Sequence, residues 1–217
     1  KTFERLYGLS LELFFHDWTE RPGNPKLLVE TEWQPQSKRL KVHVKQTQKE
    51  DVFEIPVRID VQLKGYEKSQ LAITRLMNER EFTEYFPLTG TPETVEVDPE
   101  FALLAQIEQK QSLALWESQL EKQTVGTVPA RVRAAEHFAT VRTDKSRQLL
   151  ADALANDSFY GVRTEAATAL GKVKGDIARD ALLAGLAQDD AKVRRACVTA
   201  LGNFEHDAKV QNALREK

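Results

Sequence analysis

An internal repeat in the C-terminal part of the chain constrains the fold more than any other feature. The segment Val162–Gly171 recurs as Val193–Gly202, with valine, arginine, two small residues, leucine and glycine in the same order at an offset of 31 residues. A looser copy lies one period earlier, at Arg131–Phe138. The residues that follow also repeat, because Leu150, Leu154 and Asp157 lie 32 residues before Leu182, Leu186 and Asp189. Each unit is therefore predicted to be two short helices that must stack on neighbouring units, as in short HEAT-like repeats, to bury their apolar faces.

One arginine recurs in every unit, as Arg131, Arg163 and Arg194. In one interpretation these arginines form a ladder that binds an acidic partner. In the other, each ties its repeat to a neighbouring aspartate or to helix carbonyls. We favour the structural role, because the same position in every unit indicates a role that every unit needs. Cys197 stands where the other units have alanine, so we expect a small buried residue rather than a reactive thiol.

From Leu27 to about Asp98 apolar and polar residues alternate, which predicts half-buried β-strands. The expected strands are Leu27–Trp33, Leu40–Val44 and Phe53–Leu63, followed by weaker runs at Leu71–Met77, Phe82–Leu88 and Val95–Val97. Polar turns such as Pro35–Lys38 separate them, so the pattern predicts an antiparallel β-sandwich. Pro56 lacks a backbone N–H, which predicts that its strand lies at an edge or is bulged there.

Helical patterns flank the strands. Residues Thr2–Trp18 are rich in leucine and phenylalanine, and Ser10 is a candidate cap for a short helix. After Asp98 the apolar spacing changes to three and four from Leu103 through Ile107 to Leu120, which predicts an amphipathic helix. We therefore expect a multidomain α and β protein, with an antiparallel β-sandwich followed by an all-α HEAT-like solenoid. The expected parts are helices in 1–22, the sandwich in 23–100 and the solenoid in 101–217.

Composition excludes several functions. The chain has 31 Lys and Arg against 33 Asp and Glu, a net charge of −2, which disfavours nucleic-acid binding. No apolar run approaches the ~20 residues of a membrane span, and one cysteine excludes an internal disulfide. The four histidines stand singly, so a helical two-histidine zinc site is excluded, and no phosphate-binding or nucleophile motif is present. We expect this chain alone to contain no catalytic, cofactor-binding or metal-binding residues, and we favour a cytoplasmic location.

Several motifs occur in an order typical of one enzyme family. They are Leu11-x-x-Phe14-Phe15-x-x-Trp18, Arg21-Pro22-Gly23-x-Pro25, Val44-Lys45-Gln46-Thr47-Gln48, Phe53-x-Ile55-Pro56-Val57 and Val97-Asp98-Pro99. This order resembles the region just after the catalytic domain in zinc aminopeptidases of the aminopeptidase N and leukotriene hydrolase type. In that family a small β-sandwich and an all-helical solenoid follow the catalytic domain. The family's Gly-Ala-Met-Glu-Asn-like motif, its His-Glu-x-x-His zinc helix and its catalytic tyrosine are absent here, so no catalytic or metal residue is carried over.

The resemblance implies that residues 1–22 are the last helices of a catalytic domain outside this chain, and that zinc belongs to that domain. The chain would then brace the catalytic domain and shape access to its peptide-binding cleft. Phe14, Phe15 and Trp18 are the expected contacts. Because three aromatics within five residues do not share one face of a short helix, we expect at least one to be exposed; the alternative is a wide buried face.

A second hypothesis is a protein-binding scaffold whose solenoid face holds another protein, since parts of this family have lost catalysis. A free-standing enzyme has almost no support. The expected partners are the chain's own catalytic domain and a protein on the solenoid face, without nucleic acid or membrane, and we expect a monomer.

Overall fold

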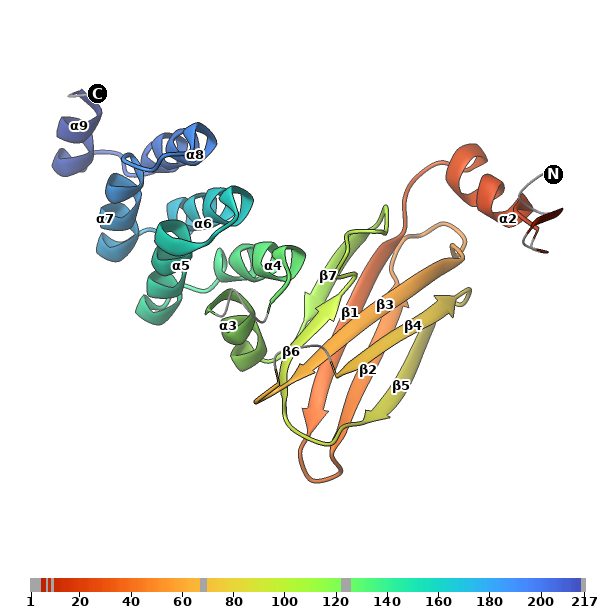
Figure 1. The fold of residues 1–217 in the computed structure, drawn as a ribbon. Coiled ribbons are helices and arrows are strands. Elements are labelled where there is room, and N and C mark those ends of the chain that lie inside the picture. Colours follow the sequence, from red (N-terminus) through yellow and green to blue (C-terminus); the bar gives the residue numbers. More distant parts are fainter. Residues whose placement is uncertain (1–4, 7, 9, 67–69, 122–125, 216–217) are drawn as a thin grey trace. The chain divides into compact units, whose positions relative to one another are not determined.

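The computed structural model describes residues 5, 6, 8, 10–66, 70–121 and 126–215. They belong to two compact units: the strands lie in the first, which ends at Ser112, and the helices from Leu113 onward lie in the second (Figure 1). The chain is thus a mixed α and β protein with a C-terminal helical part, as the sequence predicted.

A four-stranded sheet has the order β5-β2-β1-β7. Its strands are β1 (Lys26–Gln34), β2 (Arg39–Gln46), β5 (Glu81–Pro87) and β7 (Gln106–Lys110). β1 and β2 form an antiparallel hairpin in which Leu27 lies opposite Gln46, and the predicted turn at 35–38 joins them. Lys38 takes a left-handed conformation there, with φ of 49°.

A three-stranded sheet has the order β4-β3-β6. Its strands are β3 (Ile55–Leu63), β4 (Leu71–Met77) and β6 (Pro92–Val97). β3 is the central strand, and its irregularity lies between Gln62 and Leu63; the prediction of an edge or a bulge at Pro56 is therefore wrong. Proline is tolerated because the β3–β6 pairing runs only from Ile59 to Leu63, so at Pro56 β3 pairs with β4 alone.

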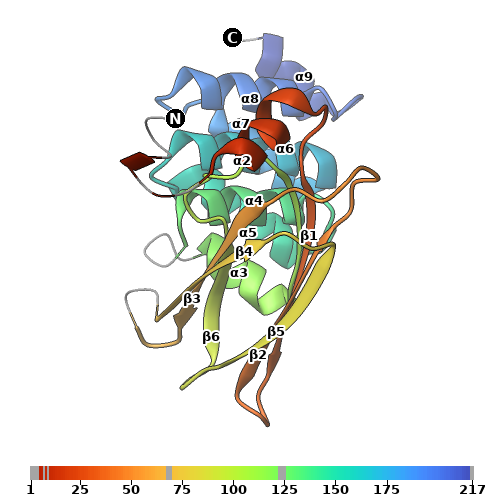
Figure 2. The same cartoon turned by 90° about the vertical axis from the view of Figure 1, so that its right-hand side faces the viewer.

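The apolar residues of the alternating runs point into one core between the sheets. Val29, Val44 and Ile59 are among the side chains that are fully buried there. Figure 2 shows β3 and β6 in one layer and β1, β2 and β5 in the other. The predicted sandwich is confirmed, with one addition: β7 pairs parallel to β1, with Lys26 opposite Gln106, so this sheet is mixed.

β7 corrects the helix that was predicted from Leu103 onward. Asp98 has φ of 46°, and its carboxylate accepts the backbone N–H groups of Ala102 at 2.8 Å and Leu103 at 3.2 Å. These bonds hold a non-helical turn, and Leu104 is exposed. The backbone of Ile107 and its neighbours then pairs with β1, whose polar groups would otherwise be unpaired along that edge.

Short helical segments precede the strands in the described part of the chain. α2 (Glu12–Phe15) leads into the π-helical turn η1 (His16–Glu20), in which the Arg21 N–H donates to the His16 carbonyl at 3.1 Å. Ser10 Oγ accepts the Glu12 N–H at 3.3 Å, near the start of α2. Much of the predicted helical segment before residue 10 lies outside the described residues.

The helices after Ser112 form the repeat that the sequence predicted. They are α3 (Leu113–Glu121), α4 (Val128–Phe138), α5 (Asp144–Asn156), α6 (Tyr160–Val173), α7 (Asp176–Gly185), α8 (Ala191–Leu201) and α9 (Ala208–Arg215). We call α4, α6 and α8 the A helices and α5, α7 and α9 the B helices. Figure 1 shows the A helices side by side in one row and the B helices in a second row.

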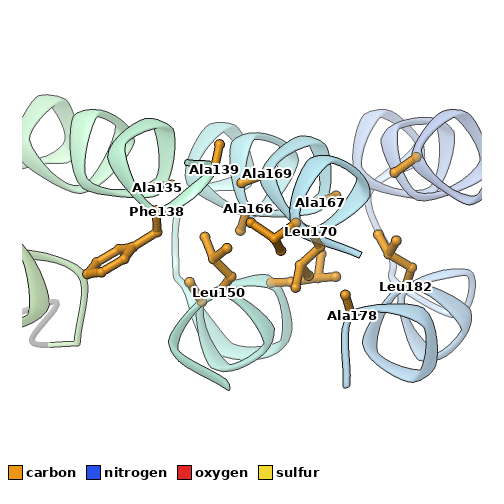
Figure 3. Packing of buried hydrophobic residues seen from close by; sticks show 14 of the residues in the cluster. Ala135, Phe138, Ala139, Leu150, Ala166, Ala167, Ala169, Leu170, Ala178 and Leu182 are labelled. Carbon is orange, nitrogen blue, oxygen red and sulfur yellow. The ribbon is translucent and has the colours of Figure 1, made fainter. Parts of the chain in front are cut away.

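Small residues let the two rows approach each other. Ala166, Ala167 and Leu170 of α6 are fully buried, and Figure 3 shows them between the rows, near Leu150 of α5 and Leu182 of α7. A Cβ atom on Gly171 would lie 2.9 Å from the Ala200 Cβ atom. Within the row of A helices, the glycine that recurs in the sequence repeat therefore permits close contact between α6 and its neighbour α8.

Candidate functional site

The π-helical turn is anchored to the sandwich by a largely buried ion pair. Arg21 donates to the Asp17 carboxylate at 2.9 Å and to the carbonyls of Val52 at 2.9 Å and Asp51 at 2.5 Å. The other Asp17 oxygen accepts the Glu54 N–H at 2.9 Å. These bonds fix the turn on the loop that precedes β3.

The aromatic residues of this segment divide between two environments. The Trp18 ring is partly buried, 5.8 Å from the Phe53 ring, and the Arg21 guanidinium lies 3.8 Å from the centre of the same Phe53 ring. Phe14 and Phe15 are 54% and 50% exposed and contact each other edge to face at 5.6 Å. The expected exposed aromatic is therefore present. We call Phe14 and Phe15, together with the exposed Leu13, the N-terminal apolar patch.

Phe14 and Trp18 are four residues apart, and α-helical spacing would place them on one face. The π-helical turn after Phe15 adds a residue to the ring closed by each hydrogen bond. Trp18 is thereby rotated toward the sandwich, while Phe14 stays exposed.

The glutamines of the Lys-Gln-Thr-Gln motif are structural. Gln46 is fully buried; its amide donates to the Phe53 carbonyl at 2.8 Å and accepts the Phe53 N–H at 2.8 Å. The Gln48 amide donates to Gln46 at 2.8 Å. Arg80 closes the loop by donating to the carbonyls of Gln48 and Glu50 at 2.7 and 2.8 Å. The motif therefore shapes the loop on which Asp17 and Arg21 rest.

Arg131 connects the two helices of the first repeat. Its guanidinium donates to both oxygens of the Asp157 carboxylate, at 2.8 and 3.2 Å, and to the Gly126 carbonyl at 2.6 Å. Arg131 is 4% exposed and Asp157 is 2% exposed. A buried, bidentate ion pair of this kind fixes the relative orientation of the two side chains in addition to contributing charge attraction.

Arg163 and Arg194 bind the loops that precede their own helices. Arg163 donates to the Asp157 carbonyl at 2.5 Å, and Arg194 donates to the carbonyls of Gln188 and Asp189 at 2.7 Å each. The structure thus places all three repeat arginines on helix-end carbonyls or a neighbouring aspartate.

The sequence analysis missed a further set of repeat arginines, which lie on the B helices. Arg147 of α5 donates to the Lys174 carbonyl at the end of α6, at 2.6 Å, and Arg179 of α7 binds the Asp207 carboxylate at 3.3 Å. Each arginine also pairs with the aspartate three residues earlier. The Asp-x-x-Arg pattern at Asp144–Arg147 recurs at Asp176–Arg179, and that signal was available in the sequence.

The described residues offer little for catalysis. No three His, Cys, Asp or Glu side chains among them gather closely enough to hold a metal ion. Cys197 is fully buried, and burial raises the pKa of its thiol to about 11, so the nucleophilic thiolate is scarce near neutral pH. His137 stacks on Trp116 with ring centres 4.7 Å apart, and burial lowers its pKa.

Within the part of the chain that the structure describes, no helix is long and apolar enough to cross a membrane.

Comparisons with known proteins agree with this architecture. Residues 126–202 match the family model of HEAT repeats. The structure is similar to the crystal structure of Legionella pneumophila aminopeptidase A in complex with aspartic acid, with a TM-score of 0.67 and 13% sequence identity. That similarity covers 99% of this chain but 31% of the aminopeptidase chain. No protein with a curated description matches the sequence.

Proposed function

We propose that this chain is the non-catalytic C-terminal region of a zinc aminopeptidase-like protein, where it braces the catalytic domain and shapes access to its peptide-binding cleft. The observation that carries the proposal is the similarity to the Legionella aminopeptidase over 99% of this chain and 31% of that one. The order of motifs from Leu11 to Pro99 supports the same family.

The N-terminal apolar patch supports the bracing role. Half-exposed neighbouring phenylalanines on a segment that is itself anchored to the sandwich provide a preformed apolar surface, and such surfaces mark interfaces. Its proposed occupant is the catalytic domain of the same protein. Burying a peptidase site behind such appended domains limits access to it and excludes water.

No three His, Cys, Asp or Glu side chains among the described residues could hold a metal ion together. The resemblance implies that zinc belongs to the proposed catalytic domain, and we propose no chemical step for this chain. A cytoplasmic location and a monomeric state remain predictions.

The test is to compare the 217-residue chain with a longer protein that also includes the polypeptide encoded before Lys1 in the gene. We expect the chain alone to bind no stoichiometric zinc and to hydrolyse no aminoacyl-arylamide. The longer protein should bind about one equivalent of zinc and hydrolyse the substrate. A longer protein with neither property would favour the alternative, a scaffold from a catalytically inactive aminopeptidase-like protein. Stoichiometric zinc at a defined site of the chain alone would contradict both.

The scaffold alternative is favoured by one specific observation. Solenoids present extended surfaces to partners, and an open groove lies along two of the A helices.

A further inference from the structure

The groove on the A-helix row lies between α6 and α8 and has a volume of about 430 Å³. Lys172 and Thr168 line it from α6, and Lys192, Arg195 and Thr199 line it from α8. None of the repeat arginines that bind carbonyls lines it. The charged side chains that line the groove are therefore distinct from the arginines that tie each repeat to a loop carbonyl.

Every charged residue in the groove lining is a cation. The Lys192 ammonium lies 4.4 Å from the centre of the Tyr160 ring and 3.3 Å from its hydroxyl, which fixes its position at one end. Arg195 is exposed and forms no ion pair with the described residues. A positive groove of this kind favours carboxylate groups, to which an arginine can bind through two parallel hydrogen bonds.

Carboxylates do lie nearby, but outside the groove lining. Burial and the charge of Glu136 raise the pKa of Glu165 on α6, while Lys172 opposes that shift. Lys172 is thus partly compensated, and Lys192 with Arg195 supplies most of the free positive charge. The acidic neighbours would repel a long polyanion that runs along the row, which favours a short segment.

The length of the groove sets the length of that segment. Residues one repeat apart face each other here, since Lys192 contacts Tyr160 and Asn203 lies against Gly171. The distance along α8 from Lys192 to Ala200, the last residue of this helix that lines the groove, is ~12 Å at 1.5 Å per residue. An extended peptide rises ~3.3 Å per residue, so about four residues cover this part of the groove.

We propose that the groove between α6 and α8 binds a short acidic segment of another polypeptide, with Lys192 and Arg195 as the main carboxylate ligands. This interaction surface is independent of the bracing role, because it uses only the helical unit.

The test measures binding of a fluorescein-labelled hexaglutamate peptide to the full 217-residue chain by fluorescence anisotropy at low salt. The variant Lys192→Glu/Arg195→Glu reverses both main cations at exposed positions. Its matched control, Arg142→Glu/Lys49→Glu, makes the same change in net charge at exposed loop positions elsewhere. Circular dichroism verifies that both variants fold.

We expect saturable binding by the native chain and by the control, weakened about tenfold or more in the groove variant, and weakened by added salt. Equal weakening in the control, or no binding at about 1 mM chain, would overturn the proposal. Tighter binding of a six-nucleotide thymidine oligomer than of the peptide would also overturn it, in favour of a nucleic-acid site.

Discussion

Asp157 and Asp190 occupy similar places before successive A helices, yet they perform different tasks. Asp190 caps α8 by accepting the N–H groups of Lys192 and Val193 at 2.7 and 3.3 Å. Asp157 instead follows the end of α5; its carboxylate accepts two hydrogen bonds from Arg131 and a third, at 2.8 Å, from the Phe159 N–H. The sequence predicted that each arginine has a structural partner. The sequence did not indicate that Asp157 would form a buried pair with Arg131, because the pairing depends on how α4 packs on α5.

The substitution Asp157→Ala should cost about 3–5 kcal/mol of unfolding free energy, because it removes the buried carboxylate that accepts two hydrogen bonds from the buried Arg131 guanidinium. Arg194→Met should cost less than about 1 kcal/mol, since Arg194 is exposed and its loss strands no buried charge. Urea unfolding followed by circular dichroism at 222 nm measures both. Similar small losses in the two variants would contradict the structural importance of the Arg131–Asp157 pair.

His137 should make the helical unit less stable in mild acid. Burial lowers its pKa in the folded chain below the ordinary value of 6.5, so the unfolded chain binds more protons between those two values. Its contribution to stability is therefore complete above about pH 6.5 and is lost as the pH falls toward the folded pKa. His137→Phe, which keeps a ring against Trp116, should flatten the dependence of the melting temperature on pH between 5 and 7.

The matched control for this prediction is His16→Gln, which replaces an exposed histidine in the other unit. An unchanged pH dependence in His137→Phe would show that His137 is not responsible. Glu165 acts in the opposite direction at lower pH, because its raised pKa makes the folded chain bind more protons.

At the scale of elements, local pattern predicted the strands and the repeat helices well, because alternation and recurrent alanines report directly on burial. β7 shows where that reasoning fails. Residues 103–107 carry apolar spacing that fits a helix, but the Asp98 carboxylate holds their start in a turn. The edge of β1, which is distant in sequence, then pairs with Gln106–Lys110. The π-helical turn at His16–Glu20 could likewise not be predicted from the sequence, because its apolar pattern is that of an ordinary short α-helix.

The substitution Ala166→Asp should disrupt the helical unit and leave the sandwich intact. Ala166 is fully buried between the helix rows, where an unpaired carboxylate costs several kcal/mol, enough to unfold a marginal repeat array. Thr168→Asp places the same group at an exposed position of the same helix and is the control. Hydrogen exchange measured by mass spectrometry should show lost protection in peptides from α4 to α8 and native protection in β1 to β3. Loss in both regions would mean that the two units unfold together.

For the whole molecule, the order of the motifs along the chain was more informative about the family resemblance than any single residue. The motifs from Leu11 to Pro99 resemble in their order those of zinc aminopeptidases, and the fold is similar to that of the Legionella enzyme over 99% of this chain. The sequence named Phe14, Phe15 and Trp18 as expected contacts, and the structure leaves Phe14 and Phe15 half exposed; that the catalytic domain covers them remains a proposal. The exposure of Phe14 and Phe15 becomes explicable when the patch is taken as half of an interface between domains.

Hydroxyl-radical footprinting tests this claim most directly, because it reports the solvent exposure of individual phenylalanine side chains. The experiment compares the 217-residue chain with the longer protein that includes the upstream-encoded polypeptide. A free tracer peptide calibrates the radical dose, and the buried Phe53 serves as the protected reference. The account predicts that Phe14 and Phe15 are oxidised readily in the chain alone and are protected several-fold in the longer protein. Equal oxidation of both residues in the two proteins would contradict the bracing role.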